Sequence, residues 1–183
     1  LWGNDIKPRN LTDAEKKEVF ANTKGWVREA GSILSGNGNT SADPEVLVAI
    51  GGLSPNMGSA NITELEFITT AFDKSDGGTL QVRARFNEPV TVTGTPQLTV
   101  VNDSRANHTL SYASGSTTNE LVFSLTIGAA NAATNAGDVL SIGTNAMALN
   151  GGTIKDTGQS GTNATITNAA SIGTAAGTIT VTA

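Results

Sequence analysis

Hydrophobic and polar residues alternate through most of the last two-thirds of the chain. In the clearest run, residues 80–86, four apolar side chains alternate with a glutamine and two arginines. A period of two places the apolar side chains on one face of a strand and the polar ones on the other. The run therefore predicts a strand with one buried face. Val90 and Val92 continue it after a break at 87–89.

Further short runs of the same kind are separated by turn-forming residues. They predict strands at 61–71, 97–101, 108–113, 120–127, 139–142, 153–155, 164–167 and 178–182, with turns at 73–78, 94–96 and 114–119. The clearest hairpin joins the strands at 108–113 and 120–127. The alanine-rich stretch 128–136 suits a helical turn and a loop equally well. Strands at intervals of about 8–12 residues indicate a β-sandwich.

The first 58 residues follow a different pattern. Residues 1–10 contain Pro8 and no periodicity, which predicts an extended arm. Thr12 and Glu15 have the spacing of a capping box, which predicts a helix from 13 to about 18 or 21. Strands are expected at 25–29 and 45–50, with a long polar loop at 31–44 between them.

A glycine- and proline-containing linker at 51–58 separates these two parts. We therefore expect two domains, a small α+β anchoring segment at 1–58 and a β-sandwich at 59–183. The expected fold class is mainly β.

The composition narrows the possible partners. The formal net charge is -5 and no cluster of basic residues occurs, which argues against nucleic acid. The chain has no cysteine, so it cannot form disulfides or cysteine zinc sites. No apolar run approaches the roughly 18–20 residues that span a bilayer, so no membrane partner is expected. No signal peptide is visible at Leu1.

Motifs for catalysis or cofactor binding are missing from the sequence. The only histidine, His108, lacks the other parts of a catalytic triad and is interpreted as a surface imidazole. We expect the chain not to be an enzyme, with no catalytic residue, no metal ligand and no cofactor.

Two acidic patterns invite other readings. Four glutamates could supply the paired carboxylates of a glycoside hydrolase: Glu64, Glu66, Glu88 and Glu120. Because few aromatic residues are present to stack against a sugar, all four are interpreted as solvated charges. The stretch 73–77 suggests a calcium loop. Ala84 stands where an EF-hand needs its glutamate, so a plain turn is favoured over a weak calcium site.

The run 78–100, GTLQVRARFNEPVTVTGTPQLTV, resembles the SWM-type repeat, a bacterial immunoglobulin-like module of surface and adhesin-like proteins. The stretches 110–116, 119–123 and 149–156 agree with that family in order. The resemblance covers about residues 62–167 and implies an immunoglobulin-like β-sandwich. This chain has a single copy and adds a strand at 178–181.

The stretches 11–27 and 45–53 are similar to the start of small virion proteins of tailed cyanophages. This resemblance implies a capsid decoration or cement protein on the virion surface, bound to the major capsid protein. Neighbouring copies of the protein itself are a further candidate partner. The alternative is an adhesin or receptor-binding module on a phage or bacterial cell surface, recognising a host glycan or protein.

Apolar residues are concentrated in this first segment, which is small and lacks a disulfide. A partner surface can bury part of that area. Phe20 and Trp26 favour a core position over an interface, whereas Trp2 in the arm favours an interface. The candidate capsid-binding residues are Trp2, Ile6, Pro8, Arg9, Leu11, Phe20 and Trp26.

Overall fold

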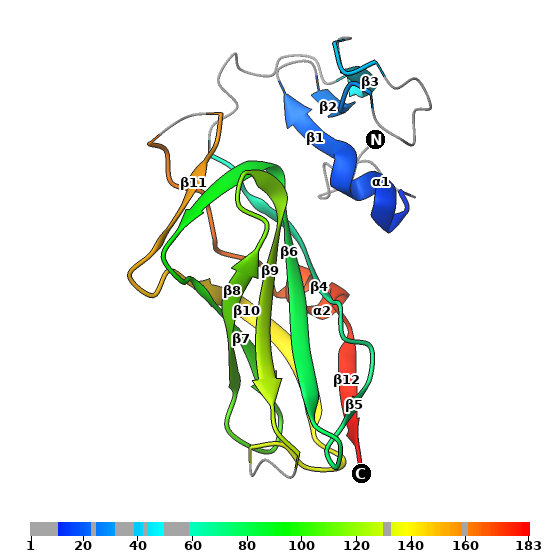
Figure 1. Ribbon diagram of the computed structural model, residues 1–183, viewed down its shortest axis with the longest axis vertical. Helices are drawn as coiled ribbons and strands as arrows, with labels where there is room; N and C mark the ends of the chain where they lie inside the picture. Colours follow the sequence, from blue (N-terminus) through cyan, green and yellow to red (C-terminus); the bar gives the residue numbers. More distant parts are fainter. Residues whose placement is uncertain are drawn as a thin grey trace. The chain divides into compact units, whose positions relative to one another are not determined.

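The computed structural model describes residues 11–22, 25–31, 39–41, 44–49, 59–129, 133–158 and 161–183. By its backbone contacts the chain divides into two compact units, Leu1–Ser59 and Ala60–Ala183. The fold is mainly β, as the alternation predicted. Within the described residues, no helix is long and apolar enough to cross a membrane. Figure 1 labels the elements of both units.

In the first unit, helix α1 spans Asp13–Glu18 and begins with the predicted capping box. Thr12 Oγ1 accepts from the backbone N–H of Glu15 at 3.3 Å, and Glu15 Oε2 accepts from the backbone N–H of Thr12 at 2.9 Å. These two bonds satisfy donors that the first turn of a helix leaves unpaired. The helix ends at the earlier of the two positions considered.

Strand β1, Val19–Asn22, follows the helix directly and was not predicted. It forms a tight antiparallel hairpin with β2, Gly25–Arg28, in which Asn22 lies opposite Gly25. Strand β3, Glu45–Ala49, pairs with the other edge of β2, so the sheet order is β1-β2-β3. The sequence prediction allowed the helix to continue to Ala21, whereas pairing with β2 makes residues 19–22 a strand.

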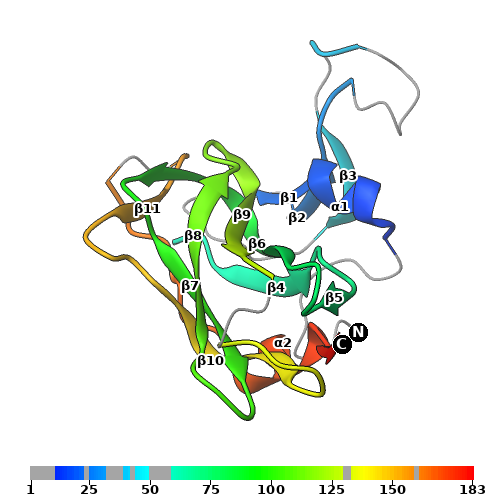
Figure 2. The same ribbon diagram turned by 60° about the horizontal axis from the view of Figure 1, so that its bottom comes forward.

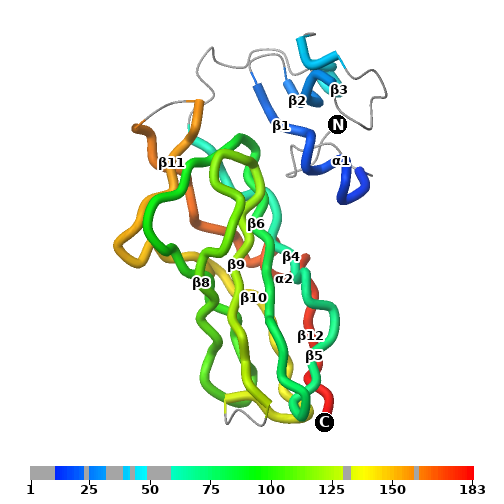
Figure 3. Tube along the Cα trace, in the orientation of Figure 1, coloured from blue at the N-terminus to red at the C-terminus, as the bar shows by residue number. Residues whose placement is uncertain are grey.

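The second unit contains nine strands and one short helix. They are β4 Ile62–Phe67, β5 Phe72–Asp73, β6 Gly78–Thr93, β7 Gln97–Asn102, β8 His108–Ser114, β9 Thr118–Ile127, β10 Val139–Ala148, β11 Thr153–Asp156, α2 Ala170–Ala175 and β12 Thr178–Thr182. The sheet order is β11-β6-β9-β8-β7-β10-β12-β5, with β4 also paired to β6. Figure 2 shows this sheet curling around the interior of the unit, and the tube in Figure 3 traces its connections.

Strands β6 to β9 form a Greek key. Three of them, β7, β8 and β9, follow one another as antiparallel neighbours, and β6 lies beside β9. This arrangement occurs in most β-sandwiches.

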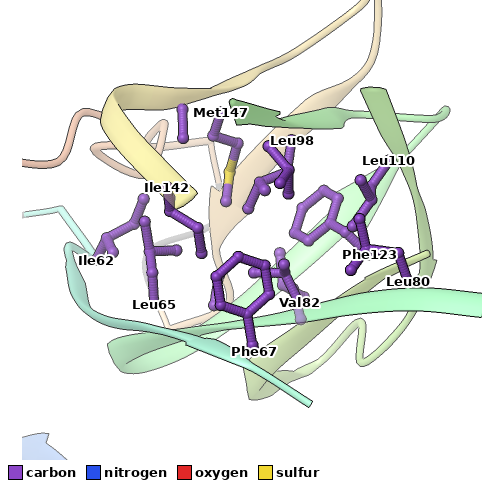
Figure 4. Packing of buried hydrophobic residues seen from close by; sticks show 14 of the residues in the cluster. Ile62, Leu65, Phe67, Leu80, Val82, Leu98, Leu110, Phe123, Ile142 and Met147 are labelled. Carbon is purple, nitrogen blue, oxygen red and sulfur yellow. The ribbon is translucent and has the colours of Figure 1, made fainter. Parts of the chain in front are cut away.

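One hydrophobic cluster fills the curled sheet, with residues from every strand between β4 and β12. The alternating side chains Leu80, Val82, Ala84 and Phe86 are all buried in it, which confirms the predicted inner face of β6. In Figure 4, Phe67, Val82 and Phe123 point toward side chains from the opposite side of the core, such as Leu98 and Met147. A buried face of this size supplies the main driving force for folding of the unit.

The expected break at 87–89 is not the end of a strand, because β6 runs through it. Before the break β6 pairs with β4 and β9; after it β11 replaces β4, and β9 pairs again where Val90 lies opposite Thr118. Pro89 has no N–H to donate, and the backbone N–H of Asn87 donates to the carbonyl of Asn61 at 3.0 Å. The break is therefore a change of neighbour with a register shift between Arg85 and Val90.

Two predictions near the end of the chain were wrong. Residues 164–167 form no strand, and residue 165 makes only an isolated bridge to Asn61. Helix α2 at Ala170–Ala175 was missed because its N-cap, Ala169, makes no side-chain cap and the sequence has no apolar period. Packing holds the helix instead: a Cβ at Gly173 would lie 2.3 Å from the carbonyl oxygen of Ile142.

Two glycines with positive φ provide a matched test of the β8–β9 turn. Gly115 has φ of 108° and a Cβ there would lie 1.9 Å from the carbonyl oxygen of Glu120, whereas Gly137 has φ of 89° and open space around it. We expect Gly137→Ala to cost about 1 kcal/mol of unfolding free energy from backbone strain alone. Gly115→Ala should cost clearly more, because the backbone must also move. Urea unfolding of both variants measures the difference, and equal losses would contradict the turn geometry.

Candidate functional site

The candidate capsid-binding residues fall into two groups. Trp2, Ile6, Pro8 and Arg9 lie outside the described residues. The other three are Leu11, Phe20 and Trp26, and they belong to the first unit. Leu11 packs against a small cluster of Val19, Ala21 and Trp26, and Phe20 is half-buried beside it on β1.

Trp26 is only 4% exposed, so its ring is part of this small core. By contrast, Val46 on β3 is 42% exposed and is the most exposed large apolar side chain in the described residues. The sequence pattern did not single out Val46, because the alternation in 45–50 does not tell which face is covered. Of the described apolar residues of this unit, Val46 is the one most available to a partner.

Arg28 on β2 links helix α1 and strand β3. Its Nη2 lies 3.4 Å from Glu15 Oε1 on α1, and its Nη1 lies 3.7 Å from Glu45 Oε2 on β3. The capping hydrogen bonds from Thr12, and then the charge of Arg28, lower the pKa of Glu15 although burial opposes them. The ion pair between Arg28 and Glu15 thus connects the helix to the sheet.

A ladder of five charged side chains crosses β4, β6 and β9 in the second unit. Arg85 Nη1 lies 2.6 Å from Glu64 Oε2 and 3.0 Å from Glu66 Oε2, and Arg85 Nε lies 2.7 Å from Glu120 Oε1. Arg83 Nη2 also contacts Glu66 Oε2 at 2.6 Å. The Arg85 side chain is only 4% exposed.

The interpretation of these glutamates as solvated charges is wrong. Strand register causes the difference: Glu64 lies directly opposite Arg85 on β4, and Glu120 lies opposite Arg85 on β9. Opposite side chains on one sheet face lie close enough to interact. The ladder links β4 and β9 to β6, which lies between them, and its glutamates are paired with arginines.

Substituting Arg85 should show how much the ladder contributes to the unfolding free energy. We expect Arg85→Gln to lower the unfolding free energy by about 3–5 kcal/mol, because three glutamates would lose their shared cation. Arg105→Gln is the matched control, since Arg105 is 39% exposed and meets Asp138 at 3.4 Å. Its loss should be at most about 1 kcal/mol. Chemical denaturation measures both, and a loss for Arg85→Gln as small as the control would contradict the structural role.

His108 is not a surface imidazole, because it is 4% exposed. Its Nε2 lies 3.3 Å from Thr134 Oγ1, and Thr134 is itself 1% exposed. Burial lowers the pKa of His108, and the charge of Asp138 opposes that shift. Histidine, hydroxyl and carboxylate thus lie near one another, but a hydroxyl this buried cannot be reached by a substrate.

Asn102, near His108, makes several hydrogen bonds through its side chain. Its Nδ2 donates to Asp138 Oδ2 at 2.9 Å, and its Oδ1 accepts from the backbone N–H groups of Ser104 and Arg105 at 3.0 and 3.2 Å. The hydrogen bond from Asn102 is the main cause that lowers the pKa of Asp138. Asn102 Nδ2 also donates to the carbonyl of Ala133, so the end of β7 is joined to the segment 133–138, whose Thr134 lies against the ring of His108.

The buried histidine should make the unit acid-sensitive. Its folded-state pKa is lowered from 6.5, so the unfolded chain takes up the proton first, and the stabilisation from burying the neutral ring is lost as pH falls below about 6.5. The difference in unfolding free energy between the native protein and His108→Gln should therefore shrink from pH 7.5 to pH 5. Chemical denaturation of both proteins at each pH gives this difference. The contributions of the other titrating groups are common to both proteins and cancel. A constant difference would contradict the assignment.

The turn at 73–77 is built by its own aspartate. Asp73 Oδ1 accepts from Ser75 N and Ser75 Oγ at 2.8 and 2.6 Å and from Asp76 N at 3.4 Å. The Ser75 side chain contributes most to lowering the pKa of Asp73. In the described ranges, no three acidic, histidine or cysteine side chains gather as they would around a metal ion. The plain-turn interpretation explains these bonds fully.

No family model, no curated protein and no solved structure matches this chain. The functional argument therefore depends on the residues themselves.

Proposed function

We propose that the chain is a virion structural protein, a decoration or cement protein of a phage capsid. In this proposal the first unit, with the arm that precedes α1, binds the major capsid protein. The second unit is an immunoglobulin-like β-sandwich displayed on the capsid surface, and neighbouring copies form a further contact. The protein is not an enzyme.

The contrast between the two hydrophobic cores carries this proposal. The core of the second unit draws on every strand from β4 to β12, which supports an independently stable domain. The described core of the first unit is a cluster of Val19, Ala21 and Trp26 with half-buried neighbours, and Val27 is buried besides. Domains of about 60 residues bury only about 60% of their unfolded surface and are marginal alone.

The first unit also lacks the usual reinforcement of small domains. It has no cysteine, and its exposed valine adds apolar area to the surface. Binding stabilises a folded unit by mass action, so a partner that covers this surface would compensate for the thin core. A capsid offers that partner in many identical copies. A stable contact needs about 1,200–2,000 Å² in total, which a small unit with an arm can supply.

The Greek key supports the immunoglobulin-like part of the proposal. Residues 78–100, which carry the resemblance to the SWM-type module, form β6, the turn at 94–96 and the start of β7. His108 is buried against Thr134, and the glutamates of the ladder are paired with arginines. Both observations support a non-catalytic role.

Capsid binding can be measured directly. Full-length protein is mixed with purified capsids of the encoding phage that lack this protein, and occupancy is determined by co-sedimentation and cryo-electron microscopy. We expect saturable binding at symmetry-related positions. Deleting residues 1–10 should reduce binding at least about a hundredfold, as expected when interface anchor residues are lost. Circular dichroism and thermal unfolding should show the second unit unchanged.

Val46→Asp tests the exposed apolar residue of the first unit. Ile68→Asp, which changes an exposed apolar residue of the second unit, is its matched control. The proposal expects Val46→Asp to weaken binding and Ile68→Asp to leave it unchanged. No binding of the intact protein to capsids would overturn it. Specific binding on a glycan array, with no capsid occupancy, would favour the receptor-binding alternative.

A further inference from the structure

The turn between β10 and β11 contains an asparagine followed by a glycine. Asn150 and Gly151 have φ of 47° and 75°, and the N–H of Gly152 donates to the carbonyl of Leu149 at 2.8 Å. Positive φ at both central residues is the pattern of a type I′ hairpin turn, for which asparagine followed by glycine is the favoured pair. The fold therefore places this dipeptide at the tip of a hairpin.

Both groups that could react in this dipeptide are accessible. Asn150 and Gly151 are exposed, and the space around Gly151 is open within the described residues. No group in the described part of the chain accepts a hydrogen bond from the backbone N–H of Gly151. The carboxamide of Asn150 is held by a hydrogen bond from Nδ2 to the carbonyl of Thr95 at 3.1 Å. A backbone nitrogen and a side-chain carbonyl carbon are thus neighbours in the chain and open to water.

We propose that Asn150 is a site of spontaneous deamidation, which converts it to aspartate and isoaspartate. The backbone nitrogen of Gly151 loses its proton to hydroxide and attacks Cγ of Asn150. The new N–Cγ bond closes a succinimide ring, the Cγ–Nδ2 bond breaks, and the departing nitrogen takes a proton from water and leaves as ammonia. Water then opens the ring. Cleavage of the N–Cγ bond gives aspartate, and cleavage of the bond to the main-chain carbonyl carbon gives isoaspartate.

Ring closure requires the nitrogen of Gly151 to approach Cγ of Asn150, so the turn must open first. Opening breaks the hydrogen bond to Thr95 and the hydrogen bond that closes the turn, and both lie in exposed segments. Local opening of an exposed turn costs much less than global unfolding. Glycine also has no side chain to obstruct the attack. The folded turn therefore slows the reaction but does not prevent it.

A second asparagine of β10 provides a comparison within the same chain. Asn145 is also exposed and has φ of 50°, close to that of Asn150. The residue that follows it, Ala146, is only 7% exposed, and its N–H donates to Asn168 Oδ1 at 2.9 Å. At Asn145 the attacking nitrogen is thus buried and hydrogen-bonded, and the next residue has a Cβ. Asn145 should therefore deamidate much more slowly than Asn150.

Isoaspartate would not fit this turn, because its main chain runs through Cβ and Cγ and is longer by one carbon. The turn has no spare room: a Cβ at Gly152 would lie 2.4 Å from the carbonyl oxygen of Thr93, and a Cβ at Gly94 would lie 2.9 Å from the Cα of Gly152. The turns at 94–96 and 149–152 thus pack backbone against backbone. A longer main chain should push them apart and loosen the pairing of β11 with β6, which begins where Thr153 lies opposite Thr93.

Peptide mapping of the full-length protein measures the reaction. The protein is incubated at mildly alkaline pH, and mass spectrometry with enzymatic detection of isoaspartate follows each asparagine separately. We expect Asn150 to deamidate at least about tenfold faster than Asn145, and faster as the pH rises. The dipeptide Asn37-Gly38 lies outside the described residues, and its peptide is mapped separately. Conversion of Asn150 no faster than that of Asn145 would overturn the proposal. This inference does not depend on the capsid role.

The effect on β11 is measured on the isoaspartate form, isolated by chromatography. We expect the amide protection factors of β11 to be about tenfold lower than in the native protein, relative to the N–H of Lys74, which donates to the carbonyl of Thr182 at 3.1 Å. Asn150→Asp is the matched control, because it removes the hydrogen bond to Thr95 but keeps the normal chain length. It should retain most of the protection. An isoaspartate form as protected as the native protein, or no less protected than Asn150→Asp, would contradict this effect.

Discussion

The second unit depends on the register of one strand. Strand β6 lies between β4 and β9 in its first half and pairs with β11 in its second, so its position determines three pairings at once. Because side chains alternate, the register that buries Leu80 and Phe86 also sets Arg85 opposite Glu64 and Glu120. A slip by one residue would turn the apolar face outward and place the arginines in the core. Hydrophobic burial and charge pairing thus select the same register.

Polar burial in this unit takes three forms with different consequences. In the ladder, charges are balanced by direct partners, so the cost of taking them out of water is offset. Around His108, a neutral ring and an asparagine network fill the space below the turn after β7. At Glu88, burial and then the charge of Asp156 raise the pKa to about 7. The last two forms make stability depend on pH in opposite directions, because the pKa of His108 is lowered and that of Glu88 is raised.

Local signals in the sequence predicted much of the fold. The capping box at Thr12, the inner face of β6 and the hairpin of β8 and β9 each depend on residues close together in the chain. What could not be predicted arises from contacts across the sheet. The glutamates were interpreted as solvated because their arginine partners are separated from them by about 20–35 residues in the chain. His108 was interpreted as exposed because Thr134, which lies against its ring, comes 26 residues later. Helix α2 has no local signal at all, and its position depends on the carbonyl of Ile142.

The order of strands in space has a consequence for biosynthesis. Strand β12 is the last strand of the unit in chain order, yet it lies between β10 and β5, and Thr182 Oγ1 donates to the carbonyl of Phe72 across 110 residues of chain. Ile179 and Val181 also complete the core. A nascent chain therefore cannot close this sheet while 178–182 is still inside the ribosome. Until then the edges of β10 and β5 that β12 will cover are unpaired. The unit is therefore most prone to pair wrongly with another copy during synthesis.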